Sequence, residues 1–583
     1  MCIMTAKDFF LNPQSIPQKQ YEALRAYYIE NKPAKEVADE FGYKHRGFTS
    51  IVLDFNKKLK ENNSGDIFFK TVQKGRKPTE KGNITKGLII GLRKQYLSLE
   101  EIKTALDALG HNISEKSIHN ILRAEGFARL PRRPKVVRQQ SRPADIKAVK
   151  TEMCDFENGS FKTVSGGTLC LLPILKKHGV DKIIENSNYP ETKSINRLSS
   201  ILSFVALKAN NIRRYSLDDL WCMDRGEGMF AGLNVLPKAA WFTSYSHRVT
   251  SNMNISLLRE LHKIWQKSDL LGNTSNLDFT TIPYWGEDAH LENNWSGKRN
   301  KALPSILAIL AHDPDTGIID YGNANVMHKN ESNTVLEFLD FYRKGSKNPG
   351  QLKYLVFDSK FTNYQNLDKL NKENVCFLTI RRRGNSIVNT INNLPKSQWK
   401  SIRVDCSANK KRTIKVNDHI TTLPGYEGEI REIYITGNGK IKPAIIITND
   451  FGSKTEDVVL KYAKRWLVEK SISEQISFFH LNNVSSSMVI KVDFDLTMSI
   501  LTFNLYRLFA LETDRYKNST STKIFENILL NSADVSIKED EIIVSLKKKR
   551  MLPVCLEMMP KYNNQKYQWL GNKKLIFEGA TYS

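Results

Sequence analysis

Three acidic residues stand where a metal-dependent reaction centre needs carboxylates. Asp278 lies in the strand-like run Asn276–Thr280, Asp358 directly follows the apolar run Tyr354–Phe357, and Glu469 lies in a helical pattern. Carboxylate oxygens are ligands that Mg²⁺ prefers, and a pair of such ions can cut and rejoin a phosphodiester backbone. The three acids therefore indicate metal-dependent chemistry on a nucleic acid.

Two further side chains share the predicted helix face of Glu469. Arg465 precedes Glu469 by four residues and Tyr462 by seven, so helical periodicity places them together. An arginine fork and a tyrosine hydroxyl both suit a phosphate. Taken singly, each residue has a simpler explanation: an aspartate after a strand often caps a helix, and an i, i+4 pair is often only a surface ion pair. The set, in this order, favours a reaction centre.

A mixed α/β core is predicted around the acids. Apolar runs separated by turn residues indicate strands and crossover helices in alternation. A carboxylate at the C-terminal end of such a strand faces the crevice where ligands bind. The expected strands are 276–283, 304–312, 318–326, 353–357 and 375–380, the second and third forming a hairpin; the expected helices are 332–344, 364–370, a long one from Thr455 that carries Glu469, and 490–512; residues 398–449 are rich in β-strand patterns.

The charge of the chain favours a polyanionic partner. The formal net charge is +25, and residues 51–150 contain 22 Lys and Arg against 10 Asp and Glu. Nearly half of the excess therefore falls in about a sixth of the chain. Such an excess binds phosphates through counterion release. An anionic membrane is the alternative, but no basic amphipathic helix or lipidation signal accompanies the charge, so we expect nucleic acid.

The N-terminal segment, about 15–62, predicts three short helices. The second of them, 33–42, ends at a glycine, and the third follows the basic residues Lys44, His45 and Arg46. This order is typical of a helix-turn-helix unit, in which the basic residues contact DNA. A plain three-helix bundle has the same pattern, and the charge favours the DNA-binding interpretation.

A second helix-turn-helix unit is predicted at about 82–126. Ser98 with Glu101 forms a capping-box pattern at the start of one of its helices. The basic stretch 129–142, with Arg132 and Arg133, cannot pack a core. It is either an arm for the DNA backbone or minor groove or a disordered linker.

Other parts of the chain limit the function without showing chemistry. Residues 146–270 carry helical patterns that predict a scaffold or dimerisation domain. Seven cysteines without a Cys-x-x-Cys pair indicate a reducing compartment and no cysteine zinc site. The sequence has no run of about 20 apolar residues, so we expect no membrane span. The N-terminus lacks the pattern of a signal peptide.

Taken as a set, these motifs resemble those of bacterial insertion-sequence transposases of the DDE type. The first-acid motif is matched by Leu277-Asp278-Phe279-Thr280 and the second by Phe357-Asp358-Ser359. Tyr462-x-x-Arg465-x-x-x-Glu469 is similar to the signature around the third acid, and Phe377 to Arg382 to the strand-then-arginine motif between them. The resemblance covers roughly residues 230–510. It implies a ribonuclease H-like core with a β-rich insertion between the second and third acids.

The resemblance also implies a mechanism and partners. Asp278, Asp358 and Glu469 would hold two Mg²⁺ (or Mn²⁺) ions for cleavage at the element ends and transfer of the 3′-hydroxyl to target DNA. Tyr462, Arg465 and Arg382 would contact this DNA, as would Lys44, Arg46, Arg132 and Arg133. We expect double-stranded DNA as partner, a homodimer in a synaptic complex, no membrane association, and a location in the bacterial cytoplasm, at the nucleoid when DNA is bound.

Two positions depart from this pattern or compete with it. The family signature often has a lysine seven residues after the glutamate, where this chain has Ile476. Glu474 is a rival acid, but five residues of helix turn it about 140° from the face of Glu469. Trp399, in the expected insertion, either stacks on a flipped base, as in similar enzymes, or belongs to the core, and Trp466 is also a core candidate. Glu287, Asp288 and His290 are expected to form a polar loop.

The predicted fold class is a multidomain α/β protein with all-α N-terminal units. The expected domains are 1–64, a first helix-turn-helix unit; 65–145, a second unit with a basic linker; 146–270, a helical domain; 271–486, a catalytic core with its β-rich insertion at about 385–455; and 487–583, a C-terminal helical region and tail. Two other functions remain open: a catalytically silent, domesticated transposase acting as a DNA-binding regulator, and a structure-specific nuclease. The intact set of acids favours the active transposase over the regulator.

Overall fold

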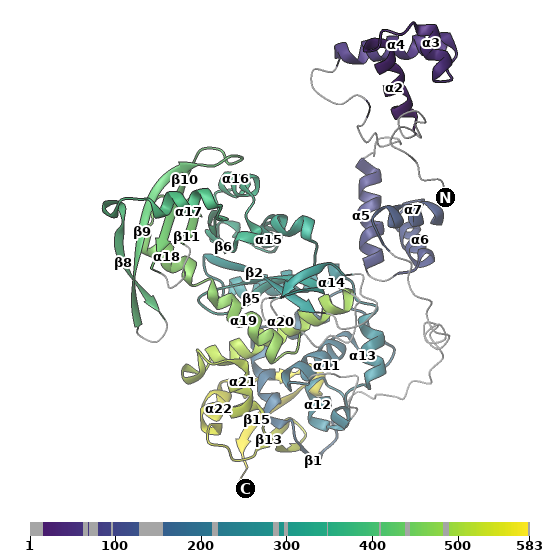
Figure 1. Cartoon of the computed structure of the whole chain (residues 1–583). Coiled ribbons are helices and arrows are strands. Elements are labelled where there is room, and N and C mark those ends of the chain that lie inside the picture. Colours follow the sequence, from purple (N-terminus) through teal and green to yellow (C-terminus); the bar gives the residue numbers. More distant parts are fainter. Residues whose placement is uncertain are drawn as a thin grey trace. The chain divides into compact units, whose positions relative to one another are not determined.

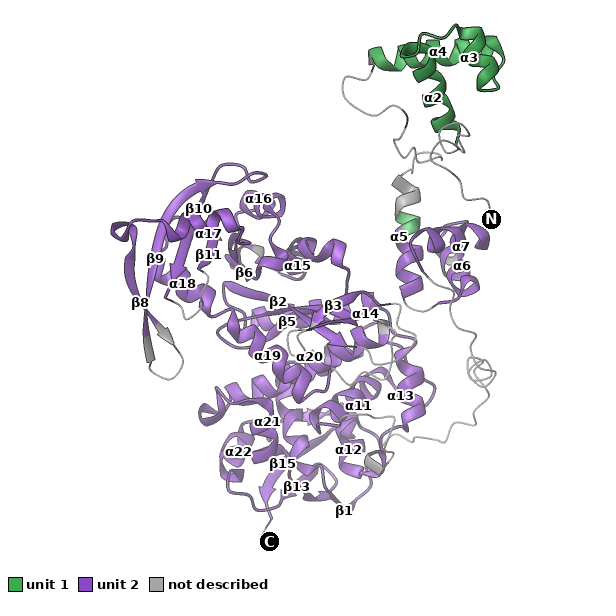
Figure 2. Ribbon diagram, viewed as in Figure 1, with its two compact units in different colours: residues 1–86 green, residues 87–583 purple. Residues whose placement is uncertain are grey.

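The computed structural model separates into two compact units (Figure 2), Met1–Lys86 and Gly87–Ser583. It describes residues 15–61, 68, 80–94, 97–127, 156–212, 220–283, 291–296, 301–346, 348–406, 410–437, 443–481 and 489–580. Across these ranges, no helix combines the length and the apolar character that crossing a membrane requires.

The first unit contains the three helices expected from the sequence. They are α2 (Ile16–Tyr28), α3 (Ala34–Glu40) and α4 (His45–Glu61), and they bury Ala23, Val37 and Phe48 between them. The third helix includes His45 and Arg46 instead of following them, so Arg46 lies in its first turn and Lys44 directly before it. Both side chains are exposed.

A second group of three helices follows. It consists of α5 (Glu80–Lys94), α6 (Leu99–Ala108) and α7 (Glu115–Ala124), which pack around the buried residues Ile89, Leu106 and Ile118. The capping box at the start of α6 is confirmed, because the Ser98 hydroxyl accepts from the Glu101 N–H while the Glu101 carboxylate accepts from the Ser98 N–H.

The central sheet combines antiparallel and parallel strands. Apart from the short β3 (Asn293–Ser296), its first five strands in chain order are β2 (Thr274–Pro283), β4 (Lys301–His312), β5 (Ile319–Val326), β6 (Tyr354–Phe357) and β7 (Cys376–Ile380). They lie in the order β5-β4-β2-β6-β7, with β5, β4 and β2 antiparallel and β2, β6 and β7 parallel. Strand β3 pairs with β4. The predicted hairpin of the second and third strands is confirmed as β4–β5.

The β-rich stretch extends this same sheet. Its strands are β8 (Lys400–Cys406), β9 (Lys410–Thr422), β10 (Glu429–Thr436) and β11 (Ala444–Thr448). β11 pairs with β7, and the order continues antiparallel as β11-β10-β9-β8. The helices α15 (Thr334–Gly345) and α16 (Tyr364–Lys372) connect β5 to β6 and β6 to β7, and α17 (Asn385–Asn392) precedes β8.

The prediction of one long helix from Thr455 is wrong, because the structure contains two helices there. α18 (Thr455–Ala463) ends before α19 (Trp466–Ser477) begins, and Lys464 and Arg465 form the junction. Tyr462 and Glu469 therefore lie on different helices, and the argument that they share one continuous helix face with Arg465 fails.

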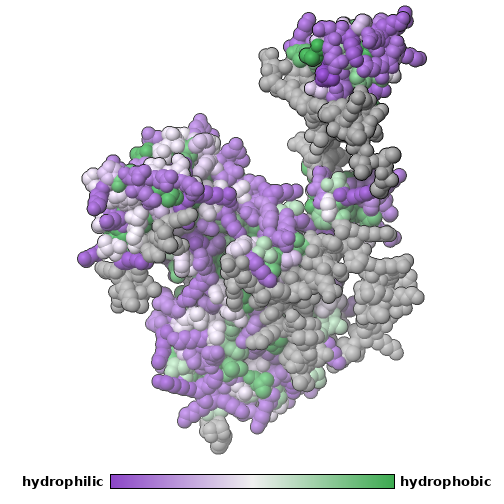
Figure 3. Space-filling view, in the orientation of Figure 1, coloured by the Kyte–Doolittle hydropathy of each residue, from purple (hydrophilic) through white to green (hydrophobic). Residues whose placement is uncertain are grey.

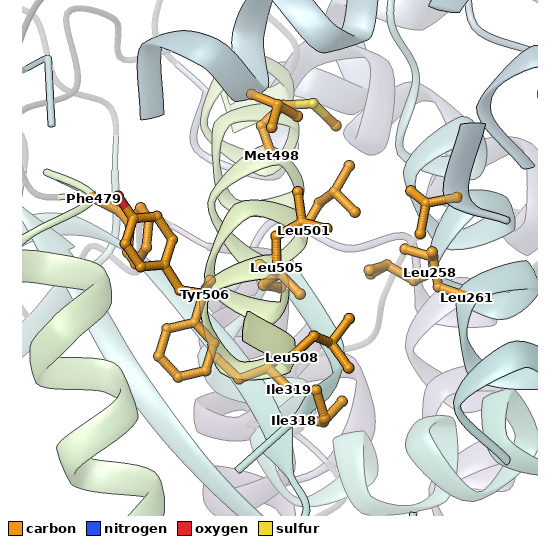
Figure 4. Close-up of a cluster of buried hydrophobic side chains, with 14 of the residues drawn as sticks. Leu258, Leu261, Ile318, Ile319, Phe479, Met498, Leu501, Leu505, Tyr506 and Leu508 are labelled. Carbon is orange, nitrogen blue, oxygen red and sulfur yellow. The ribbon is translucent and has the colours of Figure 1, made fainter. Parts of the chain in front are cut away.

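A long buried helix, α20 (Val489–Leu511), lies at the centre of the second unit (Figure 1). Figure 4 shows Leu501, Leu505 and Leu508 of this helix among buried side chains from α14 (Ser251–Lys267) and from the start of β5. Further helices from the range 146–270 belong to the same core: α9 (Leu172–Lys177), α10 (Val180–Glu185), α11 (Arg197–Ala209), α12 (Arg225–Phe230) and α13 (Ala239–Ser246).

A second sheet joins distant parts of the chain. β1 (Gly159–Thr163) pairs with β12 (Ala533–Ile537), which forms a hairpin with β13 (Glu541–Leu546). β15 (Lys573–Gly579) pairs in parallel with β13, and β14 (Lys566–Tyr567) lies at the edge. The helix α21 (Ser521–Ile524), a π-helical turn (Phe525–Leu529) and α22 (Leu552–Met558) accompany this sheet.

Candidate active site

Asp278 and Asp358 lie beside each other on neighbouring strands. Leu277 of β2 pairs with Phe357 of β6, and the parallel pairing ends there. The two aspartates that follow are thus at the same level of strands about 4.8 Å apart. Asp278 is in the middle of β2 rather than at its end, since β2 continues beside β4 to Pro283. It nevertheless marks the end of the parallel part of the sheet.

Aromatic stacking holds the segments after the two aspartates together. The rings of Phe279 and Phe361 are stacked, with centroids 4.0 Å apart and an interplanar angle of 5°. Asp358 stands at the N-cap of the 3₁₀ turn Ser359–Phe361, but its side chain makes no capping hydrogen bond. Helix capping therefore does not explain Asp358, and its carboxylate remains available to a ligand.

The junction between α18 and α19 brings Arg465 to the sheet. The buried side-chain amide of Asn276, two residues before Asp278 on β2, donates to the Lys464 carbonyl at 3.1 Å. The next residue, Arg465, donates from one terminal nitrogen to Asp278 Oδ2 at 2.7 Å and from the other to Glu469 Oε1 at 2.8 Å. One guanidinium thus joins a carboxylate of the sheet to a carboxylate of α19.

The electrostatics of this group follow from burial and from the opposed charges. Burial raises the pKa of Asp278 to about 6; Arg465 opposes this shift, whereas the negative charges of Glu469 and Asp358 add to it. Burial would lower the pKa of Arg465, but Asp278 and its other acidic neighbours outweigh it and the pKa is raised. Burial raises the pKa of Tyr462 to about 12. We call Asp278, Asp358 and Glu469 the carboxylate cluster.

The carboxylate cluster has the donor chemistry of a hard divalent cation such as Mg²⁺ or Mn²⁺. Within the described ranges, however, no three His, Cys, Asp or Glu side chains stand close enough to hold a metal ion as they are. Arg465 supplies the positive charge instead, with its side chain only 8% exposed. The residues fit a metal ion in type and place, provided that Arg465 turns away from Asp278.

Comparison with known families addresses this part of the chain. Residues 275–505 match the family model described as a transposase DDE domain. The matched segment begins on β2, ends in α20 and contains all three residues of the carboxylate cluster. It supports a DDE transposase, although it covers less than half of the chain. The comparison with curated proteins gave no match.

The other residues predicted to contact DNA come from several parts of the chain. Tyr462 is half-buried and packs against the strands of the β-rich extension, while its ring lies 5.8 Å from the Arg465 guanidinium carbon. Arg382 is exposed directly after the Arg381 that follows β7. Lys44 and Arg46 belong to the first unit. Arg132 and Arg133, the rest of the basic stretch 129–142, and the loop with Glu287, Asp288 and His290 lie outside the described residues.

The structure also shows the surroundings of the two tryptophans, of Ile476 and of Asn276. Trp466, taken as a core candidate, is 62% exposed next to Arg465, so that expectation is wrong. Trp399 packs against the small apolar cluster of Tyr434 and Ile445. Ile476 packs against the main core. For Asn276, the available signal was its position two residues before Asp278, because i and i+2 face the same side of a strand.

Proposed function

We propose that the chain is a bacterial insertion-sequence transposase that cuts DNA at the ends of its element and joins them to target DNA. The observation that carries the proposal is the convergence of Asp278, Asp358 and Glu469 around Arg465, inside the segment similar to a transposase DDE domain. The mixed sheet, with three antiparallel strands followed by two parallel ones, supports a ribonuclease H-like core, and the strands β8–β11 correspond to the proposed insertion.

The chain's own residues have distinct roles in this proposal. The carboxylate cluster would hold divalent cations, which would supply a nucleophile at neutral pH and neutralise developing charge on the phosphate. Arg465 would exchange its carboxylate contacts for a phosphate of the DNA, with the planar fork suited to two oxygens. Tyrosine is protonated near neutral pH, and burial raises the pKa of Tyr462 further, so its hydroxyl can donate to a neighbouring oxygen.

DNA recognition is assigned to the N-terminal helices. α4 presents Arg46 in its first turn with Lys44 directly before it, both exposed. Residues 51–150, which begin within this helix, carry 22 Lys and Arg against 10 Asp and Glu. We propose that the two helix-turn-helix units bind the terminal inverted repeats at the bacterial nucleoid. Since two ends must be cut together, the working form is a homodimer in a synaptic complex.

The experiment that tests the proposal is cleavage of a plasmid that carries the element with its flanking DNA. The wild type is expected to release labelled element ends in Mg²⁺ or Mn²⁺ and none in EDTA. Asp278→Asn, Asp358→Asn and Glu469→Gln should each lower cleavage by at least about 100-fold, as for loss of a group on which the transition state depends. Wild-type cleavage by any one of these variants excludes that residue from the site.

A further inference from the structure

A pocket of about 400 Å³ lies in the C-terminal part of the second unit. Its lining contains four basic side chains and one acidic one. We call it the C-terminal basic pocket; it is formed by Arg515, Tyr516, Lys523, Glu526, Asn527, Lys549, Arg550 and Met551. The lysine and arginine residues come from three separate segments, so folding, rather than a single charged run, gathers them.

The cations of the pocket fall into two kinds. Lys549 Nζ donates to two backbone carbonyls of the neighbouring turn at 2.5 and 2.7 Å, and burial lowers its pKa; it fixes the wall of the pocket. Arg515, Lys523 and Arg550 are exposed. Over the described part of the chain, no acidic side chain forms an ion pair with any of these three. Their charge is therefore available to a ligand.

Positive charge continues beyond the pocket. Lys547 and Lys548 directly follow β13 and are exposed, so that four consecutive cations lead into the pocket. Gathering unpaired like charges costs free energy, and a bound polyanion removes that cost. Figure 3 shows that hydrophilic residues cover much of the visible face of the molecule. A surface that only keeps the protein in solution can mix both signs of charge, whereas this pocket gathers one sign.

The pocket is also tied to the helix of the candidate active site. Glu474 of α19 accepts hydrogen bonds from the backbone N–H and the hydroxyl of Ser521, both at 2.8 Å. Ser521 is the first residue of α21, which also carries Lys523. Glu474 lies five residues beyond Glu469, a distance of about 7.5 Å along the helix axis. Because Glu474 is turned about 140° from Glu469 around the helix axis, a ligand in the pocket contacts an element anchored on the other side of α19 from the carboxylate cluster.

We propose that the C-terminal basic pocket binds a phosphodiester group of the same DNA duplex that reaches the carboxylate cluster. This inference rests on the proposed function and adds a contact site outside the N-terminal units. Specific protein–DNA interfaces bury roughly 1,000–2,500 Å² of protein surface, so a duplex held at the carboxylate cluster needs support around it. Arg515 and Arg550 offer planar forks for phosphate oxygens, and Lys523 offers a point charge.

Lysine acetylation of the full-length chain, read by mass spectrometry, locates the contact. With saturating duplex in EDTA, Lys523 and Lys548 are expected to become protected, whereas Lys566 on β14, which is exposed and outside the pocket, keeps its rate. Inorganic phosphate at the same ionic strength should not reproduce the protection. Equal modification of Lys523 with and without bound duplex refutes the proposal, and protection by inorganic phosphate alone reduces the pocket to a small-anion site.

The salt dependence of binding tests whether the protection reflects phosphate contacts. Lys523→Gln with Arg550→Gln should lower the slope of log affinity against log salt by about 1.8, since each lost contact to duplex DNA contributes about 0.9. The matched control is Lys566→Gln with Lys574→Gln, two cations paired across β14 and β15, and its slope should equal that of the wild type. Equal slopes for both double variants refute the DNA contact; if only self-association changes, the pocket binds another copy of the chain.

These measurements separate the two proposals because they require neither a metal ion nor cleavage. If the wild type does not cleave but the pocket variant lowers the salt slope of DNA binding, the proposed function is contradicted and the DNA contact of the pocket is still supported. An unchanged slope in a protein that cleaves contradicts the pocket alone. A wild type that does not bind duplex DNA contradicts both.

Discussion

Replacing Arg465 with methionine should tighten metal binding while abolishing cleavage. The guanidinium contacts Asp278 at 2.7 Å and Glu469 at 2.8 Å, so a metal ion must displace it to use both carboxylates. Met has a similar length and no charge. The variant therefore removes the competitor for the carboxylates and also the arginine proposed to contact phosphate.

The magnitude follows from the two contacts. A charge-assisted hydrogen bond contributes about 1.5–3 kcal/mol, and the Asp278 contact is buried, with side-chain exposures of 8% and 14%. Glu469 is 45% exposed, so solvent screening reduces its contact to at most about 1 kcal/mol. Removing about 1.5–4 kcal/mol of competition corresponds to roughly 10- to 700-fold tighter binding. Repulsion between Arg465 and the metal ion acts in the same direction.

The protonation of Asp278 determines the pH at which metal binding should be measured. Its pKa of about 6 rises further without Arg465, and a proton then competes with the metal ion. We would therefore titrate Mn²⁺ near pH 8, about two units above that pKa, in the absence of DNA. Electron paramagnetic resonance measures the concentration of free Mn²⁺. Toward pH 6 the advantage of the variant should shrink.

Arg381→Met is the matched control. Arg381 also forms an ion pair at 2.7 Å, with Glu432, but lies outside the carboxylate cluster. Its loss should leave Mn²⁺ affinity unchanged. If folded Arg465→Met binds Mn²⁺ no more tightly than the wild type, Arg465 does not compete for the carboxylates and the explanation of the cluster given above is wrong.

Three further substitutions probe other contacts. Asn276→Leu removes one of the two donors to the Lys464 carbonyl, which keeps the Leu467 N–H. The loss should cost about 0.5–1.5 kcal/mol and lower cleavage, measured by thermal unfolding and by the plasmid assay. Glu474→Gln should keep wild-type Mn²⁺ affinity, whereas Glu469→Gln should lose it. The reverse result would make Glu474, and not Glu469, the third metal ligand. Burial raises the pKa of Glu227 to about 8, so the folded state binds a proton that the unfolded chain has released, and stability falls between about pH 4.5 and 8. Glu227→Gln should unfold at a higher temperature than the wild type at about pH 8, with a gain that shrinks toward pH 5, and a constant gain would contradict this cause.

Local patterns predicted much of the sheet and its hairpin, because alternation and turn residues act over a few positions. The capping box at Ser98 is another local signal, and the structure contains it. The break between α18 and α19 was missed because no proline or glycine marks it. It coincides with a hydrogen bond from Asn276 to Lys464, 188 residues away in sequence, and such contacts leave no periodic pattern.

For the acids too, local patterns predicted some features, whereas contacts between distant residues could not be predicted. The strand-like run around Asp278 and the strand end before Asp358 indicated both residues as candidates, and pairing of Leu277 with Phe357 places them level. Helical spacing from Arg465 to Glu469 also gave the right pair, since four residues still span a turn at the start of α19. The contact between Arg465 and Asp278 depends on the junction and could not be inferred from spacing.

This contact couples the two ligands proposed for the site. Arg465 is nearly buried, so it cannot leave Asp278 without another anion to receive its charge. A DNA phosphate is such an anion, and the carboxylates that Arg465 releases then need a cation. Each ligand thus removes the cost of binding the other, and linkage requires the effect to be equal in both directions. Under the proposed function, a site arranged in this way would stay closed by its own ion pairs until DNA and metal were both present, and this would restrict hydrolysis to the bound element end.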